Sequence, residues 1–350
     1  MSTKKTTLKD IAQLAGVSLG TVDRVMNNRG EVAEVTRQRI LEITKNVGYH
    51  PDIFAKTLAS KKIFKIAVCI PESGSESEFW ESPMEGIERA VQEITHFGIT
   101  INKFLFNQFS KKSFKIALQN VMDHSPDAVV VAPVFSREVE TISSFCNQKN
   151  IPYIFINSRL QGYNQLTFIG QDEIQSGKVA GNLVNKYMSS DGEVLIVNQA
   201  NVADEEYYHL KKRKNGFKIS TNRRIHEINI ETNIPEKIDR VFLDTLHNYP
   251  QVQGVFVTNS KAHKIAQALK DYDRHLFVIG YDLIPANLAY LKDDIIDILI
   301  SQRPFDQGYL SIKALFNKLL LNKPIEKEYQ MPIEIIVKEN INFRTISYQL

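Results

Sequence analysis

Between residues 65 and 301 the chain alternates regularly between strand-like and helix-like segments. Short apolar runs such as 65–71 (KIAVCIP), 127–132 (DAVVVA) and 152–157 (PYIFIN) are typical of buried strands. The strands are predicted at 65–71, 99–107, 127–132, 152–157, 193–197, 224–230, 254–258, 276–281 and 295–301, and the helices at 81–97, 111–124, 137–149, 175–188, 213–220, 234–246, 260–270 and 285–293. Such alternation predicts parallel sheets with helices on both faces.

The same order of segments occurs twice, first over 65–157 and again over 175–301. Two halves of this kind predict an α/β body of two doubly wound parallel-sheet lobes with a cleft between them. In open α/β sheets ligands lie beyond the carboxyl ends of the strands, so the polar residues at those ends are the candidate ligand-binding residues.

The first 47 residues have a different pattern, that of short helices. Apolar positions recur at helical spacing between residues 8 and 15, Gly16 interrupts them, and Ser18 begins a second helix as its N-cap. A third helix is predicted over 35–47, with Ile40 and Leu41 facing the other two. Two short helices joined by a Gly-containing turn are typical of a helix-turn-helix, although a helical hairpin without a partner has the same pattern.

Charge is distributed unevenly along the chain. Residues 1–62 hold seven Lys and four Arg against six Asp and Glu, a net charge of +5, whereas the whole chain carries +3. The remaining residues therefore carry −2. A basic N-terminal module on a slightly acidic body fits a module that meets nucleic-acid phosphates and a body that does not.

Composition predicts a soluble globular protein in the cytoplasm. The first ten residues, MSTKKTTLKD, contain no apolar signal-peptide core, and no run of about 18 apolar residues occurs in the chain. The two cysteines, Cys69 and Cys146, lie in apolar segments without metal-ligand or disulfide spacing, so both are expected to be buried thiols.

A set of positions in register runs through residues 6–62: Thr7, Leu8, Asp10, Ile11, Ala12, Ala15, Gly16, Val17, Ser18, Thr21, Val22, Asp23, Arg24, Val25, Met26, Asn27, Val32, Thr36, Arg37, Ile40, Gly48, Tyr49, Pro51, Asp52, Ala55 and Leu58. At these positions the segment resembles the DNA-binding head and hinge of the lactose/galactose-repressor (LacI-type) family. The resemblance implies a homodimeric transcription regulator, most simply a repressor, that binds a pseudo-palindromic operator in double-stranded DNA.

The resemblance also implies which residues contact DNA. Leu19, Gly20 and Arg24 would face the major groove, and Leu58 of the hinge would wedge into the minor groove and order the hinge on DNA. The complete set of implied DNA-binding residues is Thr7, Ser18, Leu19, Gly20, Thr21, Arg24, Asn27, Ala55, Lys56 and Leu58. Gly20 and Asp23 differ from the residues that are usual in the family at these positions. The DNA sequence preference should therefore differ from that of other family members.

The body resembles the type I periplasmic-binding-protein fold that LacI-type regulators use as a sensor. The cleft residues that this implies are Phe79, Trp80, Asn157, Asp172, Arg213, Asn259, Asp282 and Gln302. Five of them have open alternatives: Trp80 as a core residue, Asp172 as a helix N-cap, Arg213 as part of a solvated basic face, and Asn259 and Asp282 as caps of the helices that follow their strands. Asn157 stands where sugar-binding relatives commonly have Asp.

These segments divide the chain into the predicted domains. An all-α three-helix head spans 1–50, a hinge helix 51–62, the first lobe 63–163 with 303–325, and the second lobe 164–302 with 326–350. Amide, carboxylate, guanidinium and aromatic groups together suit a sugar or sugar derivative. A nucleobase remains an alternative ligand, and a sugar-binding transport protein an alternative class. No catalytic motif, metal-ligand set or cofactor motif occurs, so neither enzyme activity nor a cofactor is expected.

Overall fold

The computed structural model describes residues 6–26, 29–47, 49, 63–74, 77–189, 191–199, 208–230 and 235–342. By its internal contacts the chain divides into two compact units, Met1–Lys61 and Lys62–Leu350. The predicted hinge segment 51–62, with Ala55, Lys56 and Leu58, lies outside the described residues, as does Asn27.

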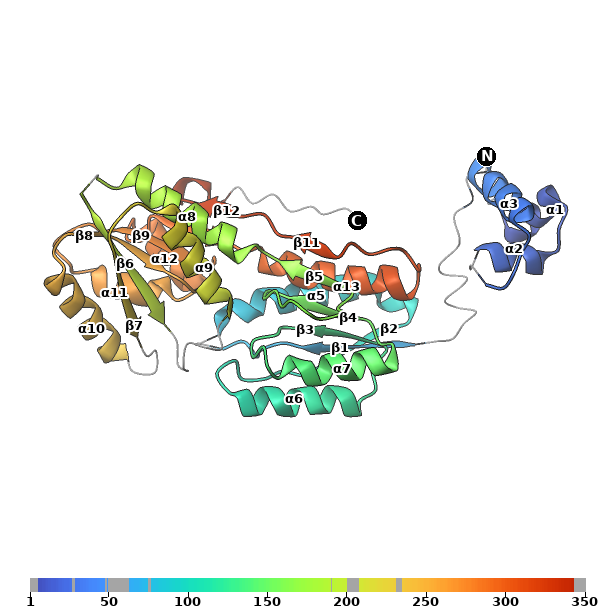
Figure 1. Ribbon diagram of the computed structural model, residues 1–350, viewed down its shortest axis with the longest axis horizontal. Helices are drawn as coiled ribbons and strands as arrows, with labels where there is room; N and C mark the ends of the chain where they lie inside the picture. Colours follow the sequence, from blue (N-terminus) through green and yellow to red (C-terminus); the bar gives the residue numbers. More distant parts are fainter. Residues whose placement is uncertain are drawn as a thin grey trace. The chain divides into compact units, whose positions relative to one another are not determined.

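The N-terminal unit contains the three expected helices, α1 (Leu8–Ala15), α2 (Leu19–Met26) and α3 (Glu34–Asn46) (Figure 1). Thr7 caps α1 in a capping box with Asp10, and Gly16 ends this helix with a left-handed backbone at φ +64°. Ser18 caps α2 as expected, because its Oγ accepts a hydrogen bond from the backbone N of Thr21 at 3.1 Å.

The three helices enclose a small apolar core made of Ile11, Ala12, Ala15, Val22, Val25 and Ile40. Ile40 is fully buried, but Leu41 is 43% exposed. The prediction that Leu41 faces the other helices is therefore wrong, since one residue turns a helix by 100° and only Ile40 and its helical neighbours reach the core.

The first lobe of the body has a six-stranded parallel sheet in the order β11-β5-β4-β3-β1-β2. Its strands are β1 (Phe64–Cys69), β2 (Ile99–Lys103), β3 (Ala128–Val131), β4 (Tyr153–Ile156), β5 (Thr167–Gly170) and β11 (Glu328–Gln330). Its helices are α5 (Glu81–Ile94), α6 (Lys111–Asp123), α7 (Val139–Lys149) and α13 (Pro304–Leu319), with short 3-10 helices η1 (Glu78–Trp80) and η2 (Thr95–Phe97). Figure 1 shows α5 and α13 on one side of this sheet and α6 and α7 on the other.

The second lobe repeats this plan with the order β12-β10-β9-β8-β6-β7, in which only β12 is antiparallel to its neighbour. Its strands are β6 (Glu193–Gln199), β7 (Ile225–Ile230), β8 (Val252–Val257), β9 (Phe277–Tyr281), β10 (Ile298–Ser301) and β12 (Glu334–Ile336). Its helices are α8 (Glu173–Tyr187), α9 (Tyr208–Ser220), α10 (Pro235–Asn248), α11 (Ala262–Leu269) and α12 (Pro285–Lys292), followed by the 3-10 helix η3 (Lys338–Asn340). The predicted fold class is confirmed, and Cys69 and Cys146 are fully buried as expected.

The chain passes between the lobes at three crossovers, 171–172, 302–303 and 331–333. The predicted boundary at 163/164 is wrong, because β5 pairs with β4 and so belongs to the first lobe. Residues 326–330 were likewise assigned to the second lobe, but β11 pairs with β5. The predicted strand over 99–107 ends at Lys103, beyond which only Phe106 pairs, with Pro71.

The Gln171 side chain links all three crossovers. Its Nε2 donates to the carbonyl of Ser301 at 3.1 Å and to the carbonyl of Pro332 at 2.9 Å. Gln171 is only 1% exposed, so these hydrogen bonds form in a water-poor environment where an unpaired carbonyl is costly.

Candidate functional site

A cavity of about 90 Å³ lies between the two lobes at the carboxyl ends of their central strands. The first lobe lines it with Ser77, Phe79, Trp80, Gln108, Phe109, Val134 and Asn157. The second lobe adds Gln199, His209, Leu210, Arg213, Asn259, Ser260, Lys261 and Asp282, and Gln302 comes from a crossover. All the predicted cleft residues except Asp172 line this cavity.

The first lobe supplies the aromatic wall of the cavity. Trp80 lies in η1 just before α5, and its Nε1 donates to Oε1 of Gln108 at 2.9 Å. Its ring meets that of Phe79 edge-on, with the ring centroids 5.0 Å apart. This hydrogen bond pairs the one polar atom of the Trp80 side chain. The ring packs in the core and also lines the cavity, so the two predicted roles are compatible.

The second lobe supplies most of the polar groups, and three of them form one hydrogen-bonded chain. The Arg213 guanidinium donates to Oε1 of Gln302 through Nη2 and to the carbonyl of Thr258 through Nη1 at 3.1 Å. Gln302 in turn donates through Nε2 to both carboxylate oxygens of Asp282, at 2.8 and 3.0 Å. Gln302 therefore lies between the positive and the negative group of the site.

Burial determines how the ionisable groups of this site titrate. Arg213 is 3% exposed and Asp282 only 2%. Burial raises the pKa of the Asp282 carboxyl to about 6, although the Arg213 charge and the Gln302 hydrogen bonds act in the opposite direction. Burial, together with the charges of Arg213 and Lys212, lowers the pKa of His209 to about 3, so its ring is neutral at pH 7.

Two strand ends, one in each lobe, share an unusual backbone conformation. Asn157 after β4 and Asp282 after β9 both have φ +69°, in the left-handed region that Asn and Asp tolerate best among residues with side chains. In each case the backbone N donates to the neighbouring strand, to the carbonyl of Ile169 or of Ile300, both at 3.0 Å. The two polar side chains thus occupy equivalent positions in the two lobes.

Arg213 reaches the cavity because α9 packs very tightly on α8. A Cβ added to Gly216 would lie 2.0 Å from the carbonyl oxygen of Ile174, and one added to Gly177 would lie 1.9 Å from that of Arg213. Only glycine fits at such contacts. The Arg213 guanidinium then lies over the Tyr281 ring, 4.1 Å from its centroid, and not on a solvated basic face.

Asn259 lines the cavity, and its side chain also organises the turn after β8. Its Nδ2 donates to the carbonyl of Gln199 at 2.7 Å, and its Oδ1 accepts from the backbone N of Lys261 at 3.0 Å. A ligand would therefore meet an amide that is already held in place on both sides.

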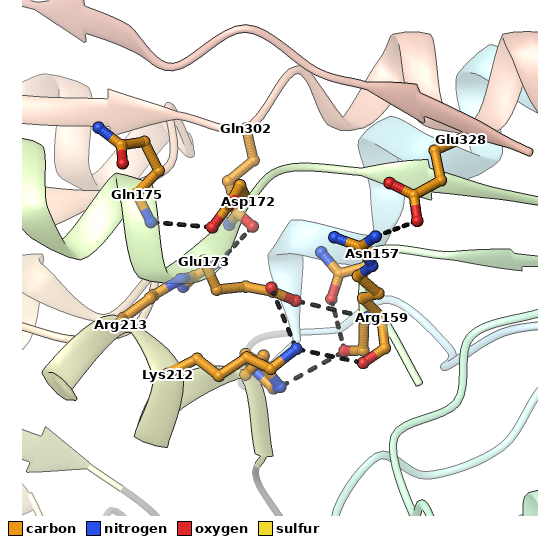
Figure 2. Close-up of polar contacts among 11 residues, drawn as sticks. Asn157, Arg159, Asp172, Glu173, Gln175, Lys212, Arg213, Gln302 and Glu328 are labelled. Carbon is orange, nitrogen blue, oxygen red and sulfur yellow. Dashed lines mark hydrogen bonds and ion pairs between the residues drawn. The ribbon is translucent and has the colours of Figure 1, made fainter. Parts of the chain in front are cut away.

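Asp172 does not line the cavity. Its Oδ1 accepts from the backbone N of Gln175 at 2.9 Å, so it caps α8, which is the alternative role considered for it (Figure 2). Arg159 also stays outside the cavity and forms an ion pair with Glu328. Its backbone, however, meets Glu173 and Lys212 of the second lobe, as Figure 2 shows.

Nine cavity residues were not predicted, namely Ser77, Gln108, Phe109, Val134, Gln199, His209, Leu210, Ser260 and Lys261. Gln199 is the last residue of β6, so the strand-end rule could have identified it. Gln108 and Phe109 lie five and six residues after β2, in a loop with no pattern of its own. Their position follows from the tertiary fold alone.

In the head, the residues expected to meet DNA lie on the exposed side of α2. Leu19 is 43% exposed, Arg24 is exposed, and a Cβ added to Gly20 would meet only Oγ of Ser18, at 3.8 Å. The hydroxyls of Ser18 and Thr21 lie 2.9 Å apart. Thr7 is exposed beside the start of α1, where its hydroxyl is part of the capping box.

Two further findings concern the described residues alone. They contain no group of three or more His, Cys, Asp or Glu side chains placed to hold a metal ion. None of the helices in that part of the chain is long and apolar enough to cross a membrane.

Residues 66–323 match the periplasmic binding protein domain, and residues 7–52 match the bacterial regulatory proteins of the lacI family. The chain belongs to the lacI family. A structure of a putative LacI transcriptional regulator from Bacteroides fragilis aligns with this lacI-family chain at a TM-score of 0.76 and 28% identity, covering 81% of this chain and 100% of that one. A solute-binding protein from Burkholderia graminis in complex with D-arabinose aligns at a TM-score of 0.72 and 18% identity, over 81% and 99% of the two chains, which shows a shared fold.

Curated relatives are similar to this lacI-family chain over different lengths. The ribose operon repressor of Halalkalibacterium halodurans is 24% identical over 95% of this chain and 96% of its own. The sucrose operon repressor of Escherichia coli is 33% identical over 38% of this chain and 39% of its own. The chain spans about half the length of the regulator MalR of Streptococcus pneumoniae, which is 24% identical over 49% of this chain and 51% of its own.

Proposed function

We propose that this protein is a transcriptional repressor whose affinity for operator DNA is controlled by a sugar bound between its two lobes. The observation that carries this proposal is the asymmetry of the cavity. One lobe presents Phe79 and Trp80, and the other presents Arg213, Asn259 and Asp282. Rings cover the C–H face of a sugar while planar polar groups pair with its hydroxyls, and relatives named as ribose and sucrose operon repressors agree with this ligand class.

The head would read DNA through α2. Arg24 is the one side chain on its exposed face able to bond guanine through two hydrogen bonds, worth about 1–3 kcal/mol of discrimination. Leu19 and Gly20 would complete the groove-facing surface, and Ser18, Thr21, Thr7 and Asn27 would lie nearer the phosphates. The hinge residues Ala55, Lys56 and Leu58 would enter the minor groove of a two-fold-symmetric site, bound by a homodimer.

The test begins by selecting an operator from random double-stranded DNA with the full-length protein. Fluorescence anisotropy then measures the operator Kd at physiological salt, with and without each sugar of a panel. We expect one sugar to change the Kd at least about tenfold. Arg24→Ala should weaken operator binding and relax the preference at one base pair.

The Arg29→Ala variant is the matched control, because it removes an equal charge beyond α2. It should weaken binding to all sequences alike. A chain that selects no sequence, or an operator Kd that responds to no small molecule, would contradict the proposed function.

A further inference from the structure

The cavity between the lobes is small for a ligand site. At about 90 Å³ it has room for about three water molecules, whereas small-molecule sites generally enclose about 300 Å³ or more. A sugar can enter only if the lobes separate. The contacts that join the lobes around the cavity therefore determine how large a ligand the closed state accepts.

One end of the cavity is closed by Lys261 and Phe109. Lys261 follows β8 of the second lobe and is 8% exposed, and Phe109 precedes α6 of the first lobe. The Lys261 ammonium lies over the Phe109 ring, 5.0 Å from its centroid. A cation over a ring is attracted by the ring's negative face, and more strongly where water is excluded.

The lobes also meet beside His209, which lines the cavity, where residues 158–159 of the first lobe contact α8 and α9 of the second. Oγ of Ser158 lies 3.4 Å from Nδ1 of His209. Lys212 donates to the carbonyl of Arg159 at 3.4 Å and lies 3.6 Å from the carboxylate of Glu173, which also accepts from the backbone N of Arg159 (Figure 2).

These two contacts lie three strands apart in the sheet of the first lobe. Ser158 follows β4, and Phe109 follows β2, with β3 and β1 between them. Three inter-strand spacings place the axes of β4 and β2 about 14 Å apart. Val134 after β3 and the rings of Phe79 and Trp80 after β1 occupy the span between them and reduce the free length further.

A larger cavity of about 490 Å³ lies next to this one. Phe79 and Asp282 line both cavities and so stand where the two adjoin. They are 9% and 2% exposed. A ligand that extended from one cavity into the other would have to displace the Phe79 ring or the hydrogen-bonded Asp282 carboxylate.

We infer that the effector is a single-ring sugar or cyclitol, and that the closed lobes exclude disaccharides. This inference rests on the proposed function of the same site. A monosaccharide requires the lobes to move apart enough for one ring. A disaccharide, nearly twice as large, would also have to break the Lys261–Phe109 contact, break the contacts at Ser158 and Arg159, or pass Phe79.

The test titrates the full-length protein with matched sugars and follows the fluorescence of Trp80, the one tryptophan of the chain, which lies in the cavity wall. Maltose is compared with glucose, and sucrose with glucose and fructose. Ribose, arabinose, tagatose, myo-inositol and the nucleobases adenine, guanine and uracil complete the panel. We expect at least one single-ring sugar or cyclitol to bind, and each disaccharide to bind at least about tenfold more weakly than its better-bound unit.

Two variants test the closing contact itself. Phe109→Ala removes the ring under Lys261 and should lower the ratio of disaccharide Kd to monosaccharide Kd. Phe104→Ala is the matched control, since it removes a ring from the same segment that packs against His124 and does not line the cavity. It should leave the ratio unchanged.

The outcomes separate the inference from the function on which it rests. A disaccharide that binds more tightly than both of its units would overturn the size limit and leave a sugar-controlled repressor in place. An equal ratio of disaccharide Kd to monosaccharide Kd in Phe109→Ala and in the parent protein would also overturn the size limit. A change in Trp80 emission with a nucleobase and with no sugar would overturn both the inference and the sugar part of the proposed function.

Discussion

At the scale of single residues, Asn157 and Asp282 determine much of the cavity. Both hold a left-handed backbone at φ +69° at the end of a buried strand, a conformation that costs energy for most residues with a side chain. Asp282 also keeps a carboxylate in a nearly water-free site, where the side chain of Gln302 donates to both of its oxygens. The left-handed backbone and the buried carboxylate therefore both lower the stability of the folded protein, and both can remain in place when a ligand binds.

The first prediction follows from the raised pKa of Asp282. The ordinary pKa of Asp, 3.8, holds in the unfolded chain, and in the folded protein the pKa is about 6, so between these values the folded state binds more protons. The contribution of Asp282 to stability therefore falls as the pH rises from about 4 to about 6. Asp282→Asn should become more stable relative to the parent protein, by up to about 2–3 kcal/mol, between pH 4.5 and pH 7.

Urea denaturation of both proteins at each pH measures this difference, and comparing variants cancels the titration of the other groups. Asp271→Asn, at an exposed position, serves as the control for the substitution itself. If the stability difference between Asp282→Asn and the parent protein does not change with pH, the Asp282 carboxyl titrates normally in the folded protein.

The residues of the site were predictable where a strand ends and unpredictable where a loop folds back. Asn157 and Asp282 follow buried strands directly, and Asn259 follows β8 after one further residue. Parallel strands bring their carboxyl ends to one edge of a sheet. Phe109 and Lys261 meet only because the two lobes close on each other. Nothing in the local sequence of either residue specifies that contact.

At the scale of elements, the contact between α8 and α9 positions Arg213. The prediction is that Gly216→Ala is strongly destabilising, because its Cβ would lie 2.0 Å from the carbonyl oxygen of Ile174 and the helices must move apart. The free energy of unfolding should fall by about 1–3 kcal/mol, and ligand affinity should fall as Arg213 shifts. Urea denaturation and Trp80 titration measure the two effects.

Asn215→Ala, at the exposed neighbouring position of α9, is the matched control and should change neither quantity by much. Equal stability of the two variants would mean that α8 and α9 tolerate a larger separation than their glycine contacts suggest.

The crossovers give a second prediction at this scale. Gln171→Leu keeps the size of the side chain but leaves the carbonyls of Ser301 and Pro332 without their donor. The free energy of unfolding should fall by about 1–3 kcal/mol. Gln175→Leu, an exposed position one turn into α8, makes the same substitution without loss of a buried contact and should cost much less. Comparable losses in both variants would show that Gln171 does not hold the crossovers together.

The elements that sequence reasoning missed are short edge or near-edge strands. β5 (Thr167–Gly170), β11 (Glu328–Gln330) and β12 (Glu334–Ile336) have only three or four residues. Too few residues are present to establish a period, and each forms because a neighbouring strand offers backbone partners. The central strands β3 (Ala128–Val131) and β4 (Tyr153–Ile156) are as short as β5, but they were predicted correctly because their continuous apolar runs reflect burial on both faces.

At the scale of the whole molecule, the head and the two-lobed body are two compact units. Under the proposed function, a ligand in the body therefore changes the affinity of the head for DNA only by changing an equilibrium between arrangements of the protein. Closure of the lobes on a sugar would make or strengthen the contacts at Phe109 and Ser158. A ligand that binds the open and closed forms equally well would leave operator affinity unchanged, however tightly it bound.

The last prediction concerns the size of this coupling. Whatever factor the effector imposes on the operator Kd, the operator must impose the same factor on the effector Kd, because the two describe one thermodynamic cycle. Anisotropy of labelled operator with saturating sugar measures the first factor, and Trp80 titration with saturating operator measures the second.

Asp282→Ala should reduce both factors toward one by removing the carboxylate at the cavity. Factors that differ beyond experimental error would mean that the sugar acts at a second site, and a full effect of sugar on Asp282→Ala would remove this cavity from the mechanism.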